Sequence, residues 1–237
     1  MNCSETVRRW RAAVPDEFVF TVKAWQGITH PAGSPTYRRA GLALSDAGWK
    51  LLGHFQPTEP VFHGWEETRA VANILKAPLI LLQAPPSFRQ TEEHERDLRA
   101  FFSEINRADE RIALELRSPW DRNRIADICR DLDLTHCVDP FREVPVSGPP
   151  FYLRLHGSPP GLRPIGSPSG IRPPGSPRGK RMYAYRYTAD DLRWLRGRIA
   201  GWEAKGEVCC LFNNLSMWQD SRAFRDLWLG TAPGGDL

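Results

Sequence analysis

Residues 79–117, LILLQAPPSFRQTEEHERDLRAFFSEINRADERIALELR, decide the fold expected for this chain. The stretch begins with the apolar run LILLQ at 79–83 and passes through a helix-forming segment at 91–106. It ends with a second apolar run, RIALELR, at 111–117. A strand, a helix and another strand in this order are typical of two parallel strands joined by a crossover helix.

The same alternation extends over most of the chain. Further apolar runs predict strands at 18–25 (FVFTVKAW), 135–140 (THCVDP), 151–157 (FYLRLHG) and 207–214 (EVCCLFNN). Helices are expected at 4–14, 45–52, 64–76, 91–106, 118–132, 188–204 and 219–229. This pattern predicts an α/β protein with a parallel sheet and outer helices. Its 237 residues and 41% hydrophobic content suffice for a single domain over 1–237.

Composition and charge restrict the environment and the partners. No stretch reaches the roughly 18 apolar residues of a membrane span, and the polar N-terminus lacks the apolar core of a signal peptide. Five cysteines without metal-ligand spacing predict a reduced, cytoplasmic protein. Residues 142–205 hold 12 Arg or Lys against four acids, which favours acidic ligands, nucleic acid among them. Solubilisation of a polar loop is the alternative explanation.

One segment departs from the strand–helix pattern. Residues 157–182 contain a nine-residue repeat, GSPPGLRPI, GSPSGIRPP and GSPRGKRMY, rich in Gly, Ser, Pro and Arg. Such a composition buries too little apolar surface to order itself, which predicts an expanded loop inserted in the domain. An arm whose arginines contact phosphates is the functional alternative.

Polar and charged residues close most of the predicted strands. Parallel α/β sheets bind ligands at the carboxyl ends of their strands, so we expect these side chains to line one concavity there. The substrate-binding candidates are Lys23, Trp25, Gln83, Arg117, Asp139, Arg154, Asn213 and Asn214. The catalytic candidates are Glu115, His156 and His30.

Spacing along the strands suggests roles for these residues. Glu115 and Arg117 are two apart and therefore share a face. They can serve as a general base and a bidentate anion clamp, or as a buried ion pair that fixes geometry. The same spacing relates Lys23 to Trp25 and Arg154 to His156. His30 can act as a general base, a metal ligand or an anion partner, or it can cap its loop by hydrogen bonding.

A metal site is a competing interpretation. It would require His30, Glu115, Asp139 and His156 to converge. The neighbouring guanidinium groups of Arg117 and Arg154 would repel a cation, so we expect no metal. Neither a Gly-x-Ser-x-Gly nucleophile motif nor a Gly-rich nucleotide-binding loop is present, and no organic cofactor is expected.

Several ordered motifs resemble one known family. They are FVFTVKAWQGITHP, LLQAPPSF, LELRSPW, VDPF, FYLRLHG and LFNNLSMWQDSRAF. Together they resemble the YecE-like proteins, domain-of-unknown-function family 72, and cover nearly the whole chain except 157–182. The resemblance implies a TIM-barrel-like fold, but it implies no settled biochemical activity.

Family members usually begin earlier, so two of eight expected strands are missing from this chain. The strands at 18–25 and 207–214 would then have unpaired edges. We therefore expect either a translation start upstream of Met1 or a form that is unstable or oligomeric on its own.

Three functional hypotheses follow from the sequence. The first is an enzyme acting on a phosphorylated or otherwise anionic substrate, such as a phosphodiester, and hence a hydrolase of phosphate esters. The second is a non-catalytic protein that binds nucleic acid or an anionic metabolite. The third is a truncated, degenerate member of the family.

Overall fold

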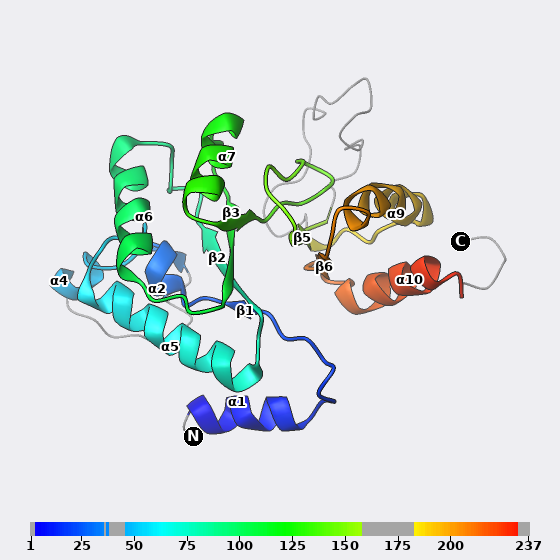
Figure 1. Ribbon diagram of the computed structural model, residues 1–237, viewed down its shortest axis with the longest axis horizontal. Helices are drawn as coiled ribbons and strands as arrows, with labels where there is room; N and C mark the ends of the chain where they lie inside the picture. The colour runs from blue at the N-terminus through cyan, green and yellow to red at the C-terminus, as the bar shows by residue number, and fades with distance from the viewer. Residues whose placement is uncertain (1–2, 36, 38–45, 158–182, 232–237) are drawn as a thin grey trace. The chain divides into compact units, whose positions relative to one another are not determined.

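The computed structural model describes residues 3–35, 37, 46–157 and 183–231. Most of the repeat at 157–182 therefore lies outside the described residues. The chain divides into two compact units, Met1–Leu134 and Thr135–Leu237 (Figure 1).

The first unit contains α1 (Cys3–Ala12), β1 (Val22–Lys23), α2 (Gln26–Thr29), α4 (Asp46–Trp49), α5 (Glu59–Leu75), β2 (Leu79–Ala84), α6 (Glu92–Glu104), β3 (Arg111–Leu116) and α7 (Arg122–Asp131). The chain leaves this unit through β4 (Leu134–His136). The second unit contains β5 (Phe151–Leu155), α9 (Ala189–Glu203), β6 (Val208–Phe212) and α10 (Met217–Leu229). All the strands expected from the sequence are present, which confirms an α/β protein with parallel sheets. Closure into a TIM-barrel-like sheet stays a prediction.

In the first unit, β2 lies between β1 and β3, and all three strands are parallel. Ile80 pairs with Val22 on one side and with Ile112 on the other. Partners in register share a face of the sheet, and the face changes with each residue along a strand. The register therefore places an apolar row through Ile80 on one face and leaves the residues that alternate with it on the other.

Two helices begin well away from their predicted first residues. The helix expected from 118 begins at Arg122, because Asp121 caps it by accepting the Arg124 N–H at 2.9 Å. The Ser118 hydroxyl instead donates to the carbonyl oxygen of Phe88. The helix expected from 64 begins at Glu59, with a proline in its first turn, where a missing N–H costs nothing. Among the described residues, no helix has both the length and the apolarity to cross a membrane.

The first strand is shorter than predicted. Pairing covers Val22 and Lys23 only, against the expected 18–25. The ladder starts late because β2 itself begins at Leu79, one residue before the partner of Val22. Phe18 and Val19 are 49% and 62% exposed, so the start of this apolar run is not buried.

The fourth strand also ends early. It covers Leu134–His136 rather than 135–140, and Val138 forms an isolated parallel bridge with Leu153 beyond it. Asp139 therefore follows the strand instead of ending it.

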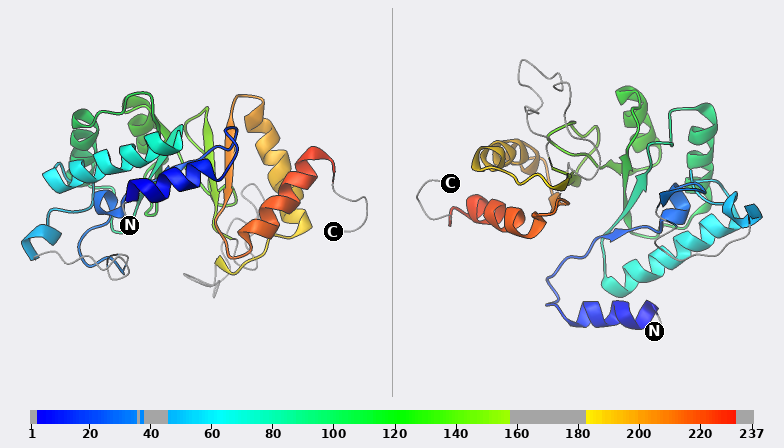
Figure 2. Two further views of the ribbon diagram at one scale, coloured as in Figure 1. Left: turned by 90° about the horizontal axis from the view of Figure 1, so that it is seen from below. Right: turned by 180° about the vertical axis from the view of Figure 1, so that it is seen from behind.

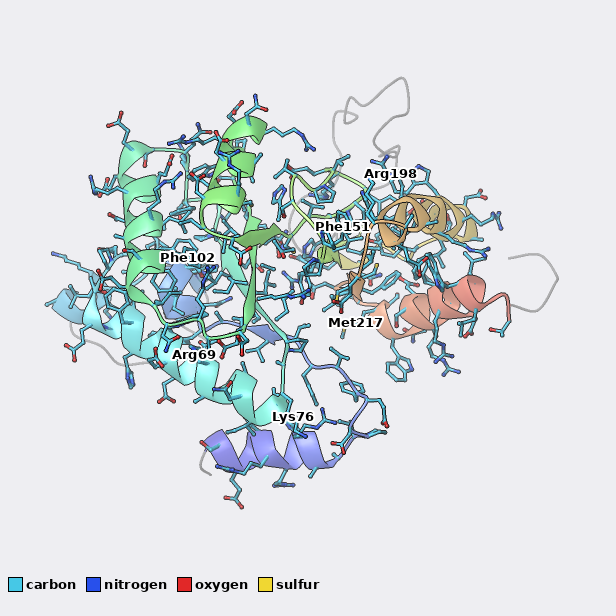
Figure 3. All side chains as sticks on the ribbon, viewed as in Figure 1. Arg69, Lys76, Phe102, Phe151, Arg198 and Met217 are labelled. Carbon is cyan, nitrogen blue, oxygen red and sulfur yellow. The ribbon has the colours of Figure 1, made fainter. Side chains whose placement is uncertain are left out.

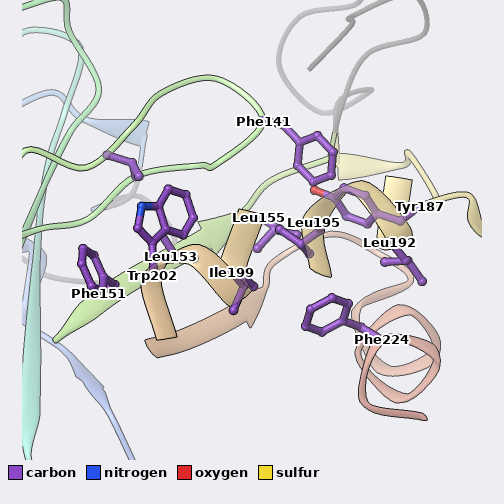
Figure 4. Close-up of a cluster of buried hydrophobic side chains, with 11 residues drawn as sticks. Phe141, Phe151, Leu153, Leu155, Tyr187, Leu192, Leu195, Ile199, Trp202 and Phe224 are labelled. Atoms are coloured by element: carbon purple, nitrogen blue, oxygen red, sulfur yellow. The ribbon is translucent and has the colours of Figure 1, made fainter. Parts of the chain in front are cut away.

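The second unit packs two helices against a parallel pair of strands. Leu153 of β5 pairs with Cys210 of β6, and Figure 2 shows α9 and α10 beside these strands. Alternate residues of β5 enter a buried apolar cluster with α9 and α10 (Figure 4). The cluster comprises Val138, Phe141, Phe151, Leu153, Leu155, Tyr187, Leu192, Leu195, Ile199, Trp202 and Phe224. Thr188 caps α9 in a capping box with Asp191.

Trp25 occupies a slot made by two glycines. A Cβ atom at Gly27 of α2 or at Gly64 of α5 would lie 2.2 Å from a carbon of the indole ring. The Trp25 backbone N–H donates to Thr68 Oγ1 of α5 at 3.2 Å, and that hydroxyl donates to the Gly64 carbonyl at 2.7 Å. The slot thus joins α2 to α5 directly after β1.

We expect Gly64→Ala to lower the free energy of unfolding by about 1–3 kcal/mol, because the new methyl group overlaps the Trp25 ring. Alanine ordinarily stabilises a helix over glycine by up to about 1 kcal/mol. Gly197→Ala in α9 is the matched control, because no atom lies within 4 Å of its added Cβ, and it should stabilise. Denaturant unfolding measures both changes. Equal stabilisation by the two variants would rule out the slot.

Candidate functional site

A polar row lies at the carboxyl end of the first sheet. Gln83 of β2 pairs in register with Glu115 of β3, so their side chains are neighbours on one face. Lys23 pairs with Leu81, two residues before Gln83, and therefore belongs to the same face. Glu115 is 4% exposed, whereas Lys23 is exposed. Three of the predicted site residues are thus brought to one face of the first unit.

Glu115 and Arg117 form the ion pair that their spacing predicted. Glu115 Oε1 lies 2.5 Å from Arg117 Nε, and the side chains are 5% and 20% exposed. A buried ion pair of this kind adds little net stability to the fold, because the cost of desolvating both charges offsets their Coulomb attraction. Its effect is to hold the guanidinium in a fixed place after β3, where a planar donor group can meet an anion.

His30 is buried beside Lys23 at the end of α2. Its Nδ1 lies 2.8 Å from Thr29 Oγ1, and its backbone carbonyl accepts the Tyr37 hydroxyl at 2.6 Å. Burial, then the positive charge of Lys23 and the nearby His54, lower the pKa of His30 to about 4. The imidazole is therefore neutral at neutral pH and can accept a proton. The hydrogen bond to Thr29 agrees with the loop-capping role as well.

Sequence reasoning missed His54, which the fold brings close to His30. The backbone N–H groups of Gly53, His54 and Phe55 donate to the carbonyls of Gly27, Thr29 and Ile28 at 2.7, 3.1 and 2.9 Å. This docking places a half-buried imidazole beside α2. Burial, followed by the nearby His94, lowers the pKa of His54 to about 4, against the opposing effect of Glu93 and Asp97.

His54 contacts the loop after β2. Its Nε2 lies 2.9 Å from Ser87 Oγ, and its ring meets the His94 ring edge to face at 4.5 Å. Ser87 is within the motif LLQAPPSF, which is the only sequence signal that pointed to this loop. No spacing between residues 54 and 87 could have linked the two, because the contact depends on the docking of the 53–55 segment.

The backbone at this segment is left-handed. Gly53, His54 and Phe55 have φ angles of 87°, 52° and 60°. Each non-glycine residue in this region costs about 1–2 kcal/mol. Phe55 is fully buried against Phe88 and Phe101, and this packing offsets its cost.

The prediction that Trp25 shares a strand face with Lys23 is wrong. The strand ends at Lys23, and Trp25 precedes the first residue of α2. Its ring lies against Gly27 and Gly64, so the alternation of the strand no longer applies.

In the second unit, Asp139 holds the backbone after β4 and β5. Its carboxylate accepts the N–H groups of Phe141 and His156, both at 3.1 Å, and Arg142 Nε lies 3.7 Å away. Burial raises the pKa of Asp139, against the opposing effect of these partners. These bonds show that Asp139 positions the chain at His156, and its contact with a substrate stays a prediction.

Arg154 and His156 follow the face of β5 that alternates with its apolar cluster residues, as their spacing predicted. Arg154 is 9% exposed and His156 is 2% exposed. His156 Nδ1 lies 3.0 Å from Asn213 Nδ2 at the end of β6. The Asn213 amide is a donor, so His156 Nδ1 must accept this hydrogen bond. The proton of the neutral imidazole is then assigned to Nε2. The structure thus brings together Arg154, His156 and Asn213.

Asn214 serves mainly to join three segments. Its Nδ2 donates to the Tyr185 carbonyl at 2.8 Å and to Asp220 Oδ2 at 2.6 Å. Asp220, which sequence reasoning missed, also accepts the Tyr187 N–H at 3.3 Å. Among the described residues, Asn214 Oδ1 is buried without a hydrogen-bond partner.

No cluster of three or more His, Cys, Asp or Glu side chains suited to a metal ion occurs within the part of the chain that the structure describes. The four residues proposed for a metal site are distributed over the two units, with His30 and Glu115 in the first and Asp139 and His156 in the second.

These features define an α/β protein with polar residues at the carboxyl ends of parallel strands. The family model for "Protein of unknown function DUF72" matches residues 1–227, and the chain belongs to this family. The predicted resemblance to the YecE-like proteins is thereby confirmed.

Solved structures of the family share the fold. A DUF72 family protein of Thermotoga maritima is 19% identical with a TM-score of 0.62, over 96% of this chain and 80% of that one. A DUF72 family protein of Enterococcus faecalis is also 19% identical, with a TM-score of 0.64 over 99% of this chain and 82% of that one. No curated protein matches this sequence.

We expect acid to destabilise the first unit through its neutral histidines. The folded pKa values of His30 and His54 are about 4, below the unperturbed 6.5. Between these values the unfolded chain binds more protons than the folded one, so stability rises with pH through this window and is lost as pH falls. The melting temperature should fall from pH 6.5 to 4, and His30→Gln should flatten that fall. An NMR titration that places the His30 midpoint near 6.5 would contradict this.

Proposed function

We propose that the protein is an enzyme acting on a phosphorylated or similarly anionic substrate, at the carboxyl ends of β1, β2 and β3. The observation that carries the proposal is the Glu115–Arg117 ion pair with Gln83 beside it. A buried charge pair adds little net stability, so its presence on this face favours a role in binding. Guanidinium groups suit phosphate oxygens because two parallel N–H bonds can form.

Lys23 and His30 supply the remaining chemistry in this proposal. Lys23 adds an exposed positive charge at the end of β1. His30 is neutral beside it and is the proposed general base. A bound phosphate would offset the charge of Lys23 and raise the pKa of His30, so the imidazole could then return its proton to a leaving group. Glu115 is proposed to hold Arg117 in place.

In the second unit, we propose His156 as an acid–base group and Arg154 and Asn213 as binding groups. The burial of Arg154 and His156 and the contact between His156 and Asn213 support this assignment. A TIM-barrel-like sheet is the arrangement that we propose for the strands, supported by their parallel pairing and by the helices between them.

The test is hydrolysis of 4-nitrophenyl phosphate and bis(4-nitrophenyl) phosphate, with and without a chelator. We expect Lys23→Gln to lower kcat/KM by about tenfold or more, since a charged hydrogen bond contributes about 1.5–3 kcal/mol. The matched control is Lys76→Gln. Lys76 has a 73% exposed side chain at the end of α5, before the amino end of β2 (Figure 3). Turnover of neither ester, or equal loss in both variants, would overturn the proposal.

A second candidate function is binding of single-stranded nucleic acid along α10. Trp218, Ser221, Arg222 and Arg225 line a groove of about 360 Å³. Trp218 is 69% exposed, and so much exposure of tryptophan is uncommon. An exposed indole beside arginines is suited to base stacking and to phosphate contacts. Arg225 also pairs with its neighbour Asp226 at 2.9 Å, which leaves Arg222 as the principal phosphate candidate.

Fluorescence anisotropy with a labelled single-stranded oligothymidine tests this candidate. Trp218→Ala should weaken binding by about tenfold, because a stacked base contributes about 1–3 kcal/mol. Arg222→Ala should weaken binding and reduce its salt dependence. Arg193→Ala on α9 is the control, since Arg193 is 55% exposed and paired with Asp190. Binding that ignores Trp218, or binding of an acidic peptide instead, would exclude this function.

A further inference from the structure

We propose that Ser87 is a nucleophile and that His54, in place of His30, is the general base of the reaction. The substrate class, a phosphate ester, rests on the function proposed above. The pairing of the two residues rests on geometry alone, because Ser87 Oγ lies 2.9 Å from His54 Nε2. Ser87 is exposed and His54 is half-buried, so a substrate can reach the hydroxyl while the base is held by the protein. This is the arrangement that activates a serine hydroxyl.

The loop that carries Ser87 is firmly anchored. The residue after it, Phe88, is fully buried, and its ring stacks on Trp120 at 5.5 Å and meets Phe55 at 5.1 Å. The Phe88 carbonyl accepts hydrogen bonds from the Ser118 hydroxyl and from Trp120 Nε1. The Phe88 N–H donates to the Pro85 carbonyl at 3.0 Å, which closes the turn around Ser87. The hydroxyl is therefore presented from a fixed backbone.

His54 is held in place from two sides. Its backbone N–H donates to the Thr29 carbonyl, and its ring packs against His94 and Phe88 at 4.5 and 5.9 Å. His94 is itself fixed, because its Nδ1 lies 2.8 Å from the Arg89 carbonyl. These contacts leave the Nε2 atom aimed at Ser87.

The left-handed backbone at His54 supports a functional role. Glycine would adopt a φ of 52° without strain, yet the chain has a histidine there. Phe55, its equally left-handed neighbour, is buried in the core, but His54 is only half-buried. Strain that packing does not offset is concentrated at functional sites. The imidazole is then the reason for histidine at this position.

The proposed reaction has two balanced steps. In the first, the Ser87 hydroxyl proton passes to His54 Nε2 while Oγ forms a bond to phosphorus. The bond from phosphorus to the leaving oxygen breaks, and the leaving group takes the proton from His54. In the second step, water gives a proton to His54 and attacks phosphorus, which breaks the Oγ–P bond and returns the proton to Ser87. No oxidant, reductant or metal enters this balance.

The charges around His54 set the pH range of the dyad. His94 disfavours its protonation, whereas Glu93 and Asp97 favour it, and His30 is close enough to interact with it. With burial as the largest influence, His54 is neutral and able to accept the serine proton above about pH 4.

Covalent labelling with diisopropyl fluorophosphate tests the dyad directly. Attack by Ser87 forms the Oγ–P bond and expels fluoride, while His54 takes the proton. Mass spectrometry should locate the label on Ser87, and labelling should vanish in Ser87→Ala, which removes only an exposed hydroxyl. His54→Gln should slow labelling by on the order of 100-fold, the usual contribution of a general base. Ser103→Ala should label at the wild-type rate, because Ser103 is an exposed serine whose hydroxyl donates to the Ala100 carbonyl.

The outcomes separate the dyad from the proposed function. Label on Ser87 that depends on His54, without hydrolysis of phosphate esters, would confirm the dyad and overturn the substrate class. Hydrolysis that depends on Lys23 while Ser87 stays unlabelled would overturn the dyad alone. His54→Gly guards against misfolding, since it removes the imidazole and relieves the left-handed backbone. If this folded variant labels at the wild-type rate, His54 is not the base.

Discussion

The docking of residues 53–55 on α2 is the constraint on which the candidate site of the first unit depends. Three consecutive backbone N–H groups are satisfied there by carbonyls of residues 27–29. Gly53 makes the approach feasible, because a Cβ at this position would lie 2.3 Å from the His30 carbonyl carbon and its φ is 87°. The same few bonds bury Phe55, set the environment of His30 and deliver His54 to the loop after β2. The backbone conformation of residues 53–55 therefore determines the surroundings of both histidines, His30 and His54.

The periodicity of apolar residues predicted the elements of the fold well, because it is a local property. The strands at 79–84 and 111–116 and the helix that Thr188 caps needed only their own residues to be recognised. The same reasoning predicted the Glu115–Arg117 pair, since alternation along one strand fixes both side chains. It failed at Trp25, where a tertiary slot between two helices overrides alternation. It also missed His54, whose partner is brought to it by loop docking over a long separation in sequence.

The polar residues of the second unit show why position at a strand end does not by itself assign a function. Asp139 and Asp220 use their carboxylates to accept backbone N–H groups, and Asn214 donates its amide protons to the Tyr185 carbonyl and to the Asp220 carboxylate. Buried backbone groups must be paired, and these side chains pair them where the chain leaves its strands. Asp139 in particular accepts the backbone N–H of His156 and thereby positions that residue. The convergence of all the predicted site residues stays a prediction.

The indole slot also limits how the sequence of this family can drift. Residues 25, 27 and 64 are far from independent, because the ring of one fills the volume that side chains of the other two would need. A relative with a larger residue at position 27 or 64 must carry a smaller one at position 25, or must separate α2 from α5. The carbonyls of α2 also accept the backbone N–H groups of residues 53–55. A change in the distance between α2 and α5 would therefore also move His54. Correlated substitution among these positions would thus mark which members of the family keep the same arrangement of loops.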